Sequence, residues 1–153
     1  MDRELRTMPT YSDTSSSQSN GTVNFVPVER GSLRYLDIGH GAPLLLIHTL
    51  RTQLDYFQKL IPLLQDRYWI LAIDLPGHGY SSIPTQARFD EPFFRRNVIE
   101  FVQKLDLEKL TIVGESIGGV LALTVAATIS KRMNRVVALN PYDYGEKFGG
   151  GIR

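Results

Sequence analysis

Five consecutive residues around position 116 have the types and spacing of a serine nucleophile site. They read Gly114-Glu115-Ser116-Ile117-Gly118 and fit the pattern Gly-x-Ser-x-Gly. A short apolar run, residues 110–113, precedes them, and an alanine-rich apolar stretch, residues 120–129, follows. A strand, a tight turn and a helix in this order hold a serine hydroxyl out at the carboxyl edge of a sheet. The sequence therefore predicts that Ser116 is a nucleophile.

The glycines of this pattern have a steric role in that prediction. Gly114 and Gly118, followed by Gly119, would let the strand and the helix pass close to each other. The N-terminus of the helix would favour negative charge developing near Ser116. The alternative is that Ser116 only caps the helix, since serine is a favoured N-cap residue. The two glycines and the preceding apolar run favour the nucleophile.

The elements that would position Ser116 follow from the alternation of two kinds of segment. Short apolar runs, typical of strands buried on both faces, occur at residues 44–47, 69–73, 110–113 and 135–139. Apolar residues at helical spacing lie between them, at residues 54–64, 93–105 and 120–129. This order predicts an α/β fold with a mostly parallel sheet and helices on both faces.

The first part of the folded region has a different pattern. Residues 23–28 and 33–38 are rich in β-forming residues, and Glu29-Arg30-Gly31-Ser32 separates them. We expect an antiparallel N-terminal hairpin here. Pro27 would restrict the first strand to the edge of the sheet, because proline cannot donate a ladder hydrogen bond.

Composition excludes several classes of protein. The 153 residues suit one domain, with 42% hydrophobic and 22% charged residues. The net charge of +1 and the absence of a long Lys/Arg run argue against a nucleic-acid partner. The chain has no cysteine, which excludes disulfides, thiolate metal sites and a cysteine nucleophile. We expect no metal and no organic cofactor, and a small molecule as substrate.

The sequence start favours a cytoplasmic protein. It reads Met1-Asp2-Arg3-Glu4 without an apolar segment typical of a signal peptide, and no apolar run is long enough to span a bilayer. Residues 7–22 are polar and poor in aliphatic side chains, so we expect residues 1–22 to be a disordered leader. An artefact of the gene start is the alternative. The folded region would then be residues 23–141.

Three landmarks in order resemble the α/β-hydrolase family, in its esterase- and lipase-like branch. They are Ile47-His48-Thr49-Leu50, then Ile73-Asp74-Leu75-Pro76-Gly77-His78-Gly79, then Gly114 to Gly119. The resemblance implies an oxyanion hole made by the backbone N–H groups of Leu50 and Ile117. This chain has Thr49 where the family usually has glycine. His48 and Asp74 are interpreted as braces of their loops, and His78 as an exposed or structural residue.

The resemblance also implies an acid and then a histidine after the nucleophile. No histidine follows Ser116, because the three histidines are His40, His48 and His78. Asp143 is a candidate acid, with a solvated loop carboxylate as the alternative. We interpret the chain as a C-terminally truncated family member in which residues 142–153 begin a lid region. Such a chain alone would be poorly stable and inactive, since residues 135–139 would form an apolar edge strand.

The predicted function is therefore a serine-dependent hydrolase that acts on an ester or related carbonyl substrate through an acyl-enzyme. Serine at the turn disfavours the haloalkane and epoxide branches of the family, which use aspartate there. Two alternatives stay open: a non-catalytic small-molecule binding protein with the same fold, and a degraded gene. Oligomeric state and substrate identity are not predicted.

Overall fold

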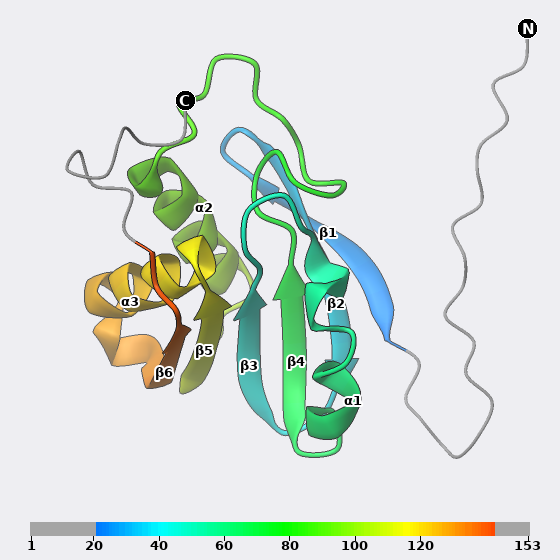
Figure 1. The fold of residues 1–153 in the computed structure, drawn as a ribbon. Helices are drawn as coiled ribbons and strands as arrows, with labels where there is room; N and C mark the ends of the chain where they lie inside the picture. The colour runs from blue at the N-terminus through cyan, green and yellow to red at the C-terminus, as the bar shows by residue number, and fades with distance from the viewer. Residues whose placement is uncertain (1–20, 143–153) are drawn as a thin grey trace, which may run out of the picture.

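The computed structural model describes residues 21–142, which form one mixed sheet in the order β1-β2-β4-β3-β5-β6 (Figure 1). Its strands are β1 (Thr22–Val28), β2 (Gly31–Gly39), β3 (Ala42–Ile47), β4 (Tyr68–Ile73), β5 (Leu110–Glu115) and β6 (Met133–Leu139). β3 pairs in parallel with β4 and β5, and β5 pairs in parallel with β6. β2 is antiparallel to both β1 and β4. This confirms the predicted fold class and the N-terminal hairpin.

The hairpin turns at Glu29 and Arg30, and Gly31 follows with a φ of +131°, which a residue with a side chain rarely adopts. Pro27 lies in β1, at one edge of the described sheet, opposite Ser32. The predicted edge position of Pro27 is therefore confirmed.

The two central strands are buried on both faces, as their continuous apolar runs predicted. In β3, Leu45 and Ile47 face the larger core cluster, and Leu44 and Leu46 face the smaller one. All four side chains are at most 3% exposed. Because successive side chains of a strand point to opposite faces, both faces need a covering layer.

Helices supply the two covering layers. One face is covered by α2 (Glu91–Lys104) and α3 (Ile117–Thr128), which add their apolar side chains to the larger cluster. The other face is covered by the 3₁₀ helix η1 (Leu54–Phe57) and by α1 (Ile61–Leu64), through Phe57 and Ile61. A second 3₁₀ helix, η2 (Ser130–Arg132), leads into β6.

The apolar spacing over residues 54–64 predicted one helix, and this was wrong. The segment contains η1, a turn and then α1. Pro62 explains the break, because it has no N–H to donate to the carbonyl of residue 58 in a continuous helix. Proline is tolerated in the first turn of a helix, where Pro62 stands in α1. The apolar helix after Ser116 also starts earlier than predicted, at Ile117.

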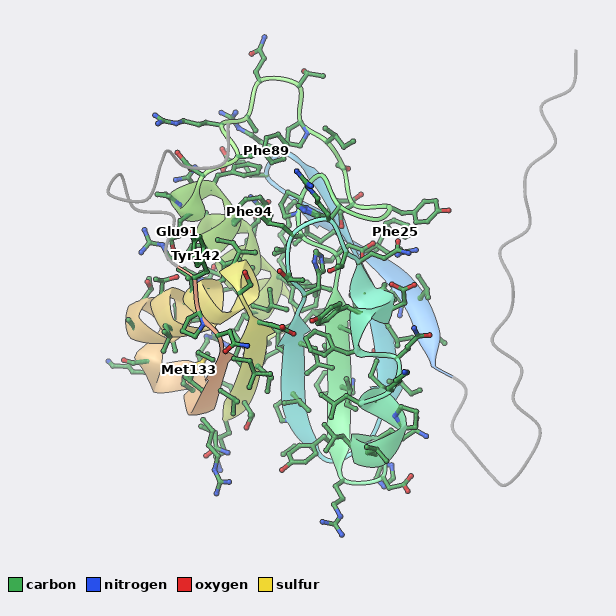
Figure 2. The ribbon with its side chains drawn as sticks, viewed as in Figure 1. Phe25, Phe89, Glu91, Phe94, Met133 and Tyr142 are labelled. Atoms are coloured by element: carbon green, nitrogen blue, oxygen red, sulfur yellow. The ribbon has the colours of Figure 1, made fainter. Side chains whose placement is uncertain are left out.

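Residues 135–139 form an apolar edge strand, as expected for the truncated chain, and the prediction of a strand buried on both faces was wrong in part. Val136 packs against the larger cluster, but Val137 and Leu139 are each 42% exposed. β6 is at an edge of the described sheet, opposite β1; Phe25 of β1 and Met133 of β6 mark the two edges in Figure 2. Among the described residues, α3 covers one face of β6 and the other face has no covering layer.

The remaining boundary predictions fall largely outside the described residues. Residues 1–20 and 143–153 lie there, including most of the predicted leader, the predicted lid region and Asp143. β1 begins at Thr22, the last residue of the predicted leader. Within residues 21–142, every helix is too short or too polar to cross a membrane.

Candidate active site

Ser116 occupies a strained position between β5 and α3. Its φ is 56° and its ψ is −116°, a combination outside the allowed regions for a residue with a side chain. Two backbone hydrogen bonds hold it there: Ser116 N–H donates to the Leu139 carbonyl at 3.0 Å, and Val120 N–H donates to the Ser116 carbonyl at 3.1 Å. Strain of this kind persists only where the surrounding structure enforces it, and it is concentrated at functional sites.

The Ser116 side chain does not cap the helix. Ser116 stands at the N-cap position of α3, but its side chain accepts no hydrogen bond from the first turn. Within residues 21–142 its hydroxyl makes no hydrogen bond at all, and the residue is half-buried. A serine selected for capping would satisfy one of the free N–H groups of the helix. The hydroxyl is therefore available for another partner.

The glycines around Ser116 lie in backbone-to-backbone contact. A Cβ on Gly114 would overlap the carbonyl of Gly118, and a Cβ on Gly118 would overlap the carbonyl of Ile47. Gly119 has slightly more room, since its Cβ would lie 3.1 Å from the Leu139 carbonyl oxygen. These contacts bring the first turn of α3 against β5 and against the end of β3.

His48 braces the loop after β3, as predicted. It is completely buried, and its Nε2 accepts a hydrogen bond from Leu75 N–H at 3.0 Å. Its Nδ1 lies 2.6 Å from the Thr49 carbonyl oxygen, which can only accept, so Nδ1 carries the proton. Burial lowers the pKa of His48 from 6.5 to about 4, although the Thr49 hydrogen bond opposes this. His48 is therefore a neutral link between two loops.

Asp74 braces the loop after β4, also as predicted. Its carboxylate is fully buried and accepts hydrogen bonds from Arg34 Nε at 2.6 Å, Leu54 N–H at 2.7 Å and Tyr80 N–H at 3.0 Å. Arg34 is 4% exposed, and the Tyr80 ring covers its guanidinium at 4.5 Å. A buried ion pair with its oxygens satisfied in this way joins β2 to the loops after β3 and β4.

A further contact, which the sequence interpretation missed, links η1 to the residue before Ser116. The Tyr56 hydroxyl donates a hydrogen bond to the carboxylate of Glu115, the residue before Ser116. This bond raises the pKa of Tyr56 above its usual 10, because loss of the proton would place two negative charges together. Phe57, next in the chain, is buried in the smaller cluster and anchors η1. No pattern in the sequence pairs residues 56 and 115.

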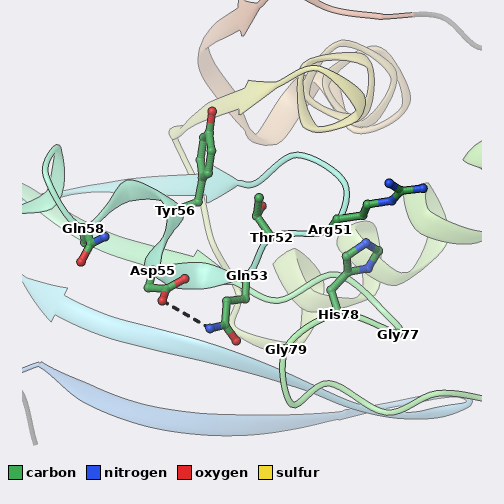
Figure 3. Close-up of a pocket in the computed structure, with 9 residues that line it drawn as sticks. All are labelled: Arg51, Thr52, Gln53, Asp55, Tyr56, Gln58, Gly77, His78 and Gly79. Carbon is green, nitrogen blue, oxygen red and sulfur yellow. Dashed lines mark hydrogen bonds between the residues drawn. The ribbon is translucent and has the colours of Figure 1, made fainter. Parts of the chain in front are cut away.

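A polar cleft of about 570 Å³ opens between the loops after β3 and β4 (Figure 3). Ser116 does not line it, but Tyr56 does, and the bond from Tyr56 to Glu115 places the cleft beside the turn that holds Ser116. The lining residues are Arg51, Thr52, Gln53, Asp55, Tyr56, Gln58, Gly77, His78 and Gly79.

The other predicted site residues lie at the same edge of the sheet. Leu50 follows β3 and packs in part against the larger cluster, and Ile117 is the buried first residue of α3. Thr49 does not have a positive φ; the positive φ of this loop is at Arg51, at 60°. Within residues 21–142, no three His, Asp or Glu side chains are placed to hold a metal ion.

Comparison with known proteins identifies the fold family. A family model described as the alpha/beta hydrolase fold matches residues 42–150. The chain belongs to the α/β-hydrolase fold family. A serine hydrolase-like protein from Danio rerio is 34% identical over 122 residues, which are 78% of this chain and 37% of that protein. Haloalkane dehalogenase 2 from Mycobacterium tuberculosis is 32% identical over 113 residues, 74% of this chain and 40% of that protein.

Solved structures agree with this assignment to the α/β-hydrolase fold. A bacterial membrane phospholipase A superposes with a TM-score of 0.73 at 30% identity, covering 76% of this chain and 38% of that one. The hydrolase of E-2-(acetamidomethylene)succinate superposes with a TM-score of 0.75 at 25% identity. The match covers 81% of this chain and 46% of that one. The chain thus spans less than half the length of these relatives.

Proposed function

We propose that the protein to which this chain belongs is a serine-dependent hydrolase with Ser116 as its nucleophile. The observation that carries the proposal is the strained turn at Ser116, with a φ of 56° and a side chain that makes no hydrogen bond within residues 21–142. A cap residue does not need the strained backbone and uses its hydroxyl to accept a hydrogen bond from the helix, whereas a nucleophile needs the strained turn and a hydroxyl left available for its general base. The relatives named as hydrolases support this assignment.

The proposed reaction is acyl transfer on an ester or related carbonyl compound. The Ser116 hydroxyl oxygen attacks the carbonyl carbon while a general base takes its proton. The N–H groups of Leu50 and Ile117 stabilise the oxyanion of the tetrahedral intermediate, which collapses to an acyl-enzyme and releases the leaving group with a proton. Water then attacks the acyl-enzyme, the bond to the Ser116 oxygen breaks, the carboxylic acid is released and Ser116 recovers its proton.

The general base of this reaction is proposed to be a histidine from a later part of the protein, outside these 153 residues. His48 cannot serve, because both of its ring nitrogens are engaged and it is fully buried. His78 donates from Nδ1 to the Pro76 carbonyl and packs 5.2 Å from the His48 ring, beside the cleft. No histidine follows Ser116 in the sequence. The acid of the triad is proposed at Asp143, which lies outside the described residues.

The substrate is proposed to be a small molecule with a polar portion. The cleft beside Tyr56 is lined by polar side chains, including Arg51 and Asp55. The net charge of +1 and the lack of a long Lys/Arg run in the sequence argue against a nucleic-acid substrate. Serine at the turn, rather than a carboxylate, favours carbonyl substrates over the haloalkanes of the dehalogenase relatives.

The proposal is tested by hydrolysis of p-nitrophenyl esters with the complete protein and its Ser116→Ala variant. Loss of turnover by a factor of about 10³ or more is expected, with Ser130→Ala, on the exposed helix η2, as a matched control that retains activity. Equal turnover by wild type and Ser116→Ala would rule out the proposed nucleophile. Ligand binding without turnover by the wild type would instead support the non-catalytic binding protein.

A further inference from the structure

One carbonyl group in the loop after β3 is held by two donors. The Thr49 carbonyl oxygen accepts a hydrogen bond from His48 Nδ1–H at 2.6 Å and another from the Thr52 hydroxyl at 2.7 Å. A carbonyl oxygen has two lone pairs, so both of its acceptor positions are in use. The carbonyl is therefore fixed in direction as well as in place.

A fixed carbonyl also fixes the next N–H group. The Thr49–Leu50 peptide is trans, and a trans peptide is planar with its C=O and N–H pointing in opposite directions. The Leu50 N–H must then point away from the His48 ring and the Thr52 hydroxyl. Within residues 21–142 this N–H makes no hydrogen bond of its own. An N–H held in one direction with no partner is what an oxyanion donor requires.

The two donors are themselves held. His48 is buried, and Leu75 N–H holds its Nε2 from the neighbouring loop. Thr52 is half-buried and follows Arg51, whose φ of 60° turns the chain back so that the Thr52 hydroxyl reaches the carbonyl three residues earlier. Further along, Leu54 N–H donates to Asp74. The loop is thus braced on both sides of Leu50.

We propose that Thr52 is a positioning residue that, with His48, sets the direction of the Leu50 N–H before substrate binds. This inference rests on the proposed function, since it gives the Leu50 N–H its role as an oxyanion donor. It explains how the loop orients this peptide with Thr49 where glycine would be expected: the positive φ is taken by Arg51, and the peptide is held by side chains instead.

The expected kinetic effect is confined to the chemical step. Without the Thr52 hydroxyl the Thr49 carbonyl keeps one donor, and the peptide plane can rotate. Removal of a whole oxyanion donor costs about 10²–10³ in kcat, so misorientation of one donor should cost about 10-fold to 100-fold. KM should change little, because the oxyanion exists only in the transition state and the intermediate.

The test compares Thr52→Val, which keeps the shape but loses the donor, with Thr52→Ser, which keeps the hydroxyl. In the complete protein we expect Thr52→Val to lower kcat on p-nitrophenyl esters by about 10-fold or more at unchanged KM. Thr52→Ser should retain most of the wild-type kcat. Wild-type kcat in Thr52→Val, an effect on KM alone, or equal losses in both variants would overturn the inference. Thermal unfolding of both variants checks that each is folded.

A second measurement separates this inference from the proposed function. In ¹⁵N NMR relaxation we expect Thr52→Val to lower the order parameter of the Leu50 amide and Thr52→Ser to leave it near the wild-type value. An unchanged order parameter in Thr52→Val would overturn the positioning role, whatever the activity. Turnover that persists in Ser116→Ala would instead overturn the proposed nucleophile and leave the NMR result standing on its own.

Discussion

Two neighbouring regions at the carboxyl edge of the sheet are held in place by opposite means. The loops after β3 and β4 are held by side chains, since Asp74 accepts three hydrogen bonds there and His48 joins the two loops. The turn between β5 and α3 is held by the absence of side chains, because Gly114 and Gly118 bring backbone against backbone. Within residues 21–142 the Ser116 side chain makes no hydrogen bond that would hold its own turn.

The two regions should respond differently to substitution of their residues. A loop held by side chains loses one bond at a time, and its neighbours can relax. A turn held by backbone contact cannot accept even one added carbon without moving a strand or a helix, because packed interiors have few voids. Substitutions in the two regions should therefore lower stability by different amounts and for different reasons.

The largest effect is expected at Gly118. Gly118→Ala would place a carbon against the Ile47 carbonyl and 2.8 Å from the His48 carbonyl oxygen, both on backbone that cannot move independently. We expect a loss of stability of about 3 kcal/mol or more, above the usual range for overpacking. Urea unfolding measures it.

Gly119→Ala is the matched control, because its added carbon would lie 3.1 Å from the Leu139 carbonyl oxygen in the same helical turn. Gly119→Ala should lower the free energy of unfolding clearly less than Gly118→Ala does. Equal losses in the two variants would contradict the backbone-contact account of the turn.

The next effect is expected at Asp74. Asp74→Asn leaves Arg34 buried without its anion, and breaking a buried pair costs about 3–5 kcal/mol. Asp106→Asn removes a surface pair with Arg132, in which the Asp106 side chain is 83% exposed, and should cost under about 1 kcal/mol. The two losses of stability are compared through the denaturant midpoints of the variants. Similar midpoints for both variants would show that Asp74 does not brace the loops.

A smaller effect is expected on acidification, through His48. Burial lowers its pKa from 6.5 to about 4; His78 lowers it further, while the Thr49 bond, Asp74 and Asp55 act in the opposite direction. Between these pH values the unfolded chain binds a proton at His48 and the folded chain does not, so stability falls as pH falls. At about 1.4 kcal/mol per pKa unit, the loss approaches about 3 kcal/mol by pH 4.

This pH dependence is measured by urea unfolding from about pH 7 to about pH 4. His48→Gln should remove the part of the stability loss that comes from His48. His40→Gln, at an exposed position, should leave that pH dependence unchanged. A pH profile that His48→Gln leaves unchanged would show that His48 already takes up its proton in the folded state.

The smallest effect is expected at the contact that joins the two regions, between Tyr56 and Glu115. Tyr56→Phe removes one exposed hydrogen bond and should change stability by under about 1 kcal/mol. The difference in ultraviolet titration between wild type and Tyr56→Phe isolates Tyr56, which should ionise above pH 10. Glu115→Gln should lower that pKa, because the neighbouring negative charge is gone. A pKa that stays the same in Glu115→Gln would mean that this contact does not form.

Local signals in the sequence predicted much of the fold and part of the site. Residues 44–47 read as a buried strand because burial on both faces leaves no polar position. The pattern around Ser116 was visible because a tight turn needs glycine at fixed offsets. Long-range contacts were not visible. Nothing local pairs Arg34 with Asp74 across 40 residues, although an arginine between Leu33 and Tyr35 in an apolar strand signals a buried partner.

Other errors came from reading one feature without its neighbours. The helical spacing over residues 54–64 predicts one helix only where the effect of Pro62 is left out, and Pro62 lies in the first turn of a separate helix, α1. The apolar run at residues 135–139 indicates burial on both faces, but burial depends on what covers a strand, and within residues 21–142 one face of β6 lacks a covering layer. The sequence does not indicate a role for Thr52, because that role depends on the direction of the Thr49 carbonyl group in the folded loop.

The central claim is that Ser116 is an activated nucleophile on a turn held by glycines. The most direct measurement is reaction of the folded, complete protein with a fluorophosphonate, followed by mass spectrometry of its peptides to locate the adduct. The account predicts one phosphonylated residue, Ser116, and no adduct in Ser116→Ala. A folded protein that remains unlabelled, or that carries the adduct on another serine, would contradict it.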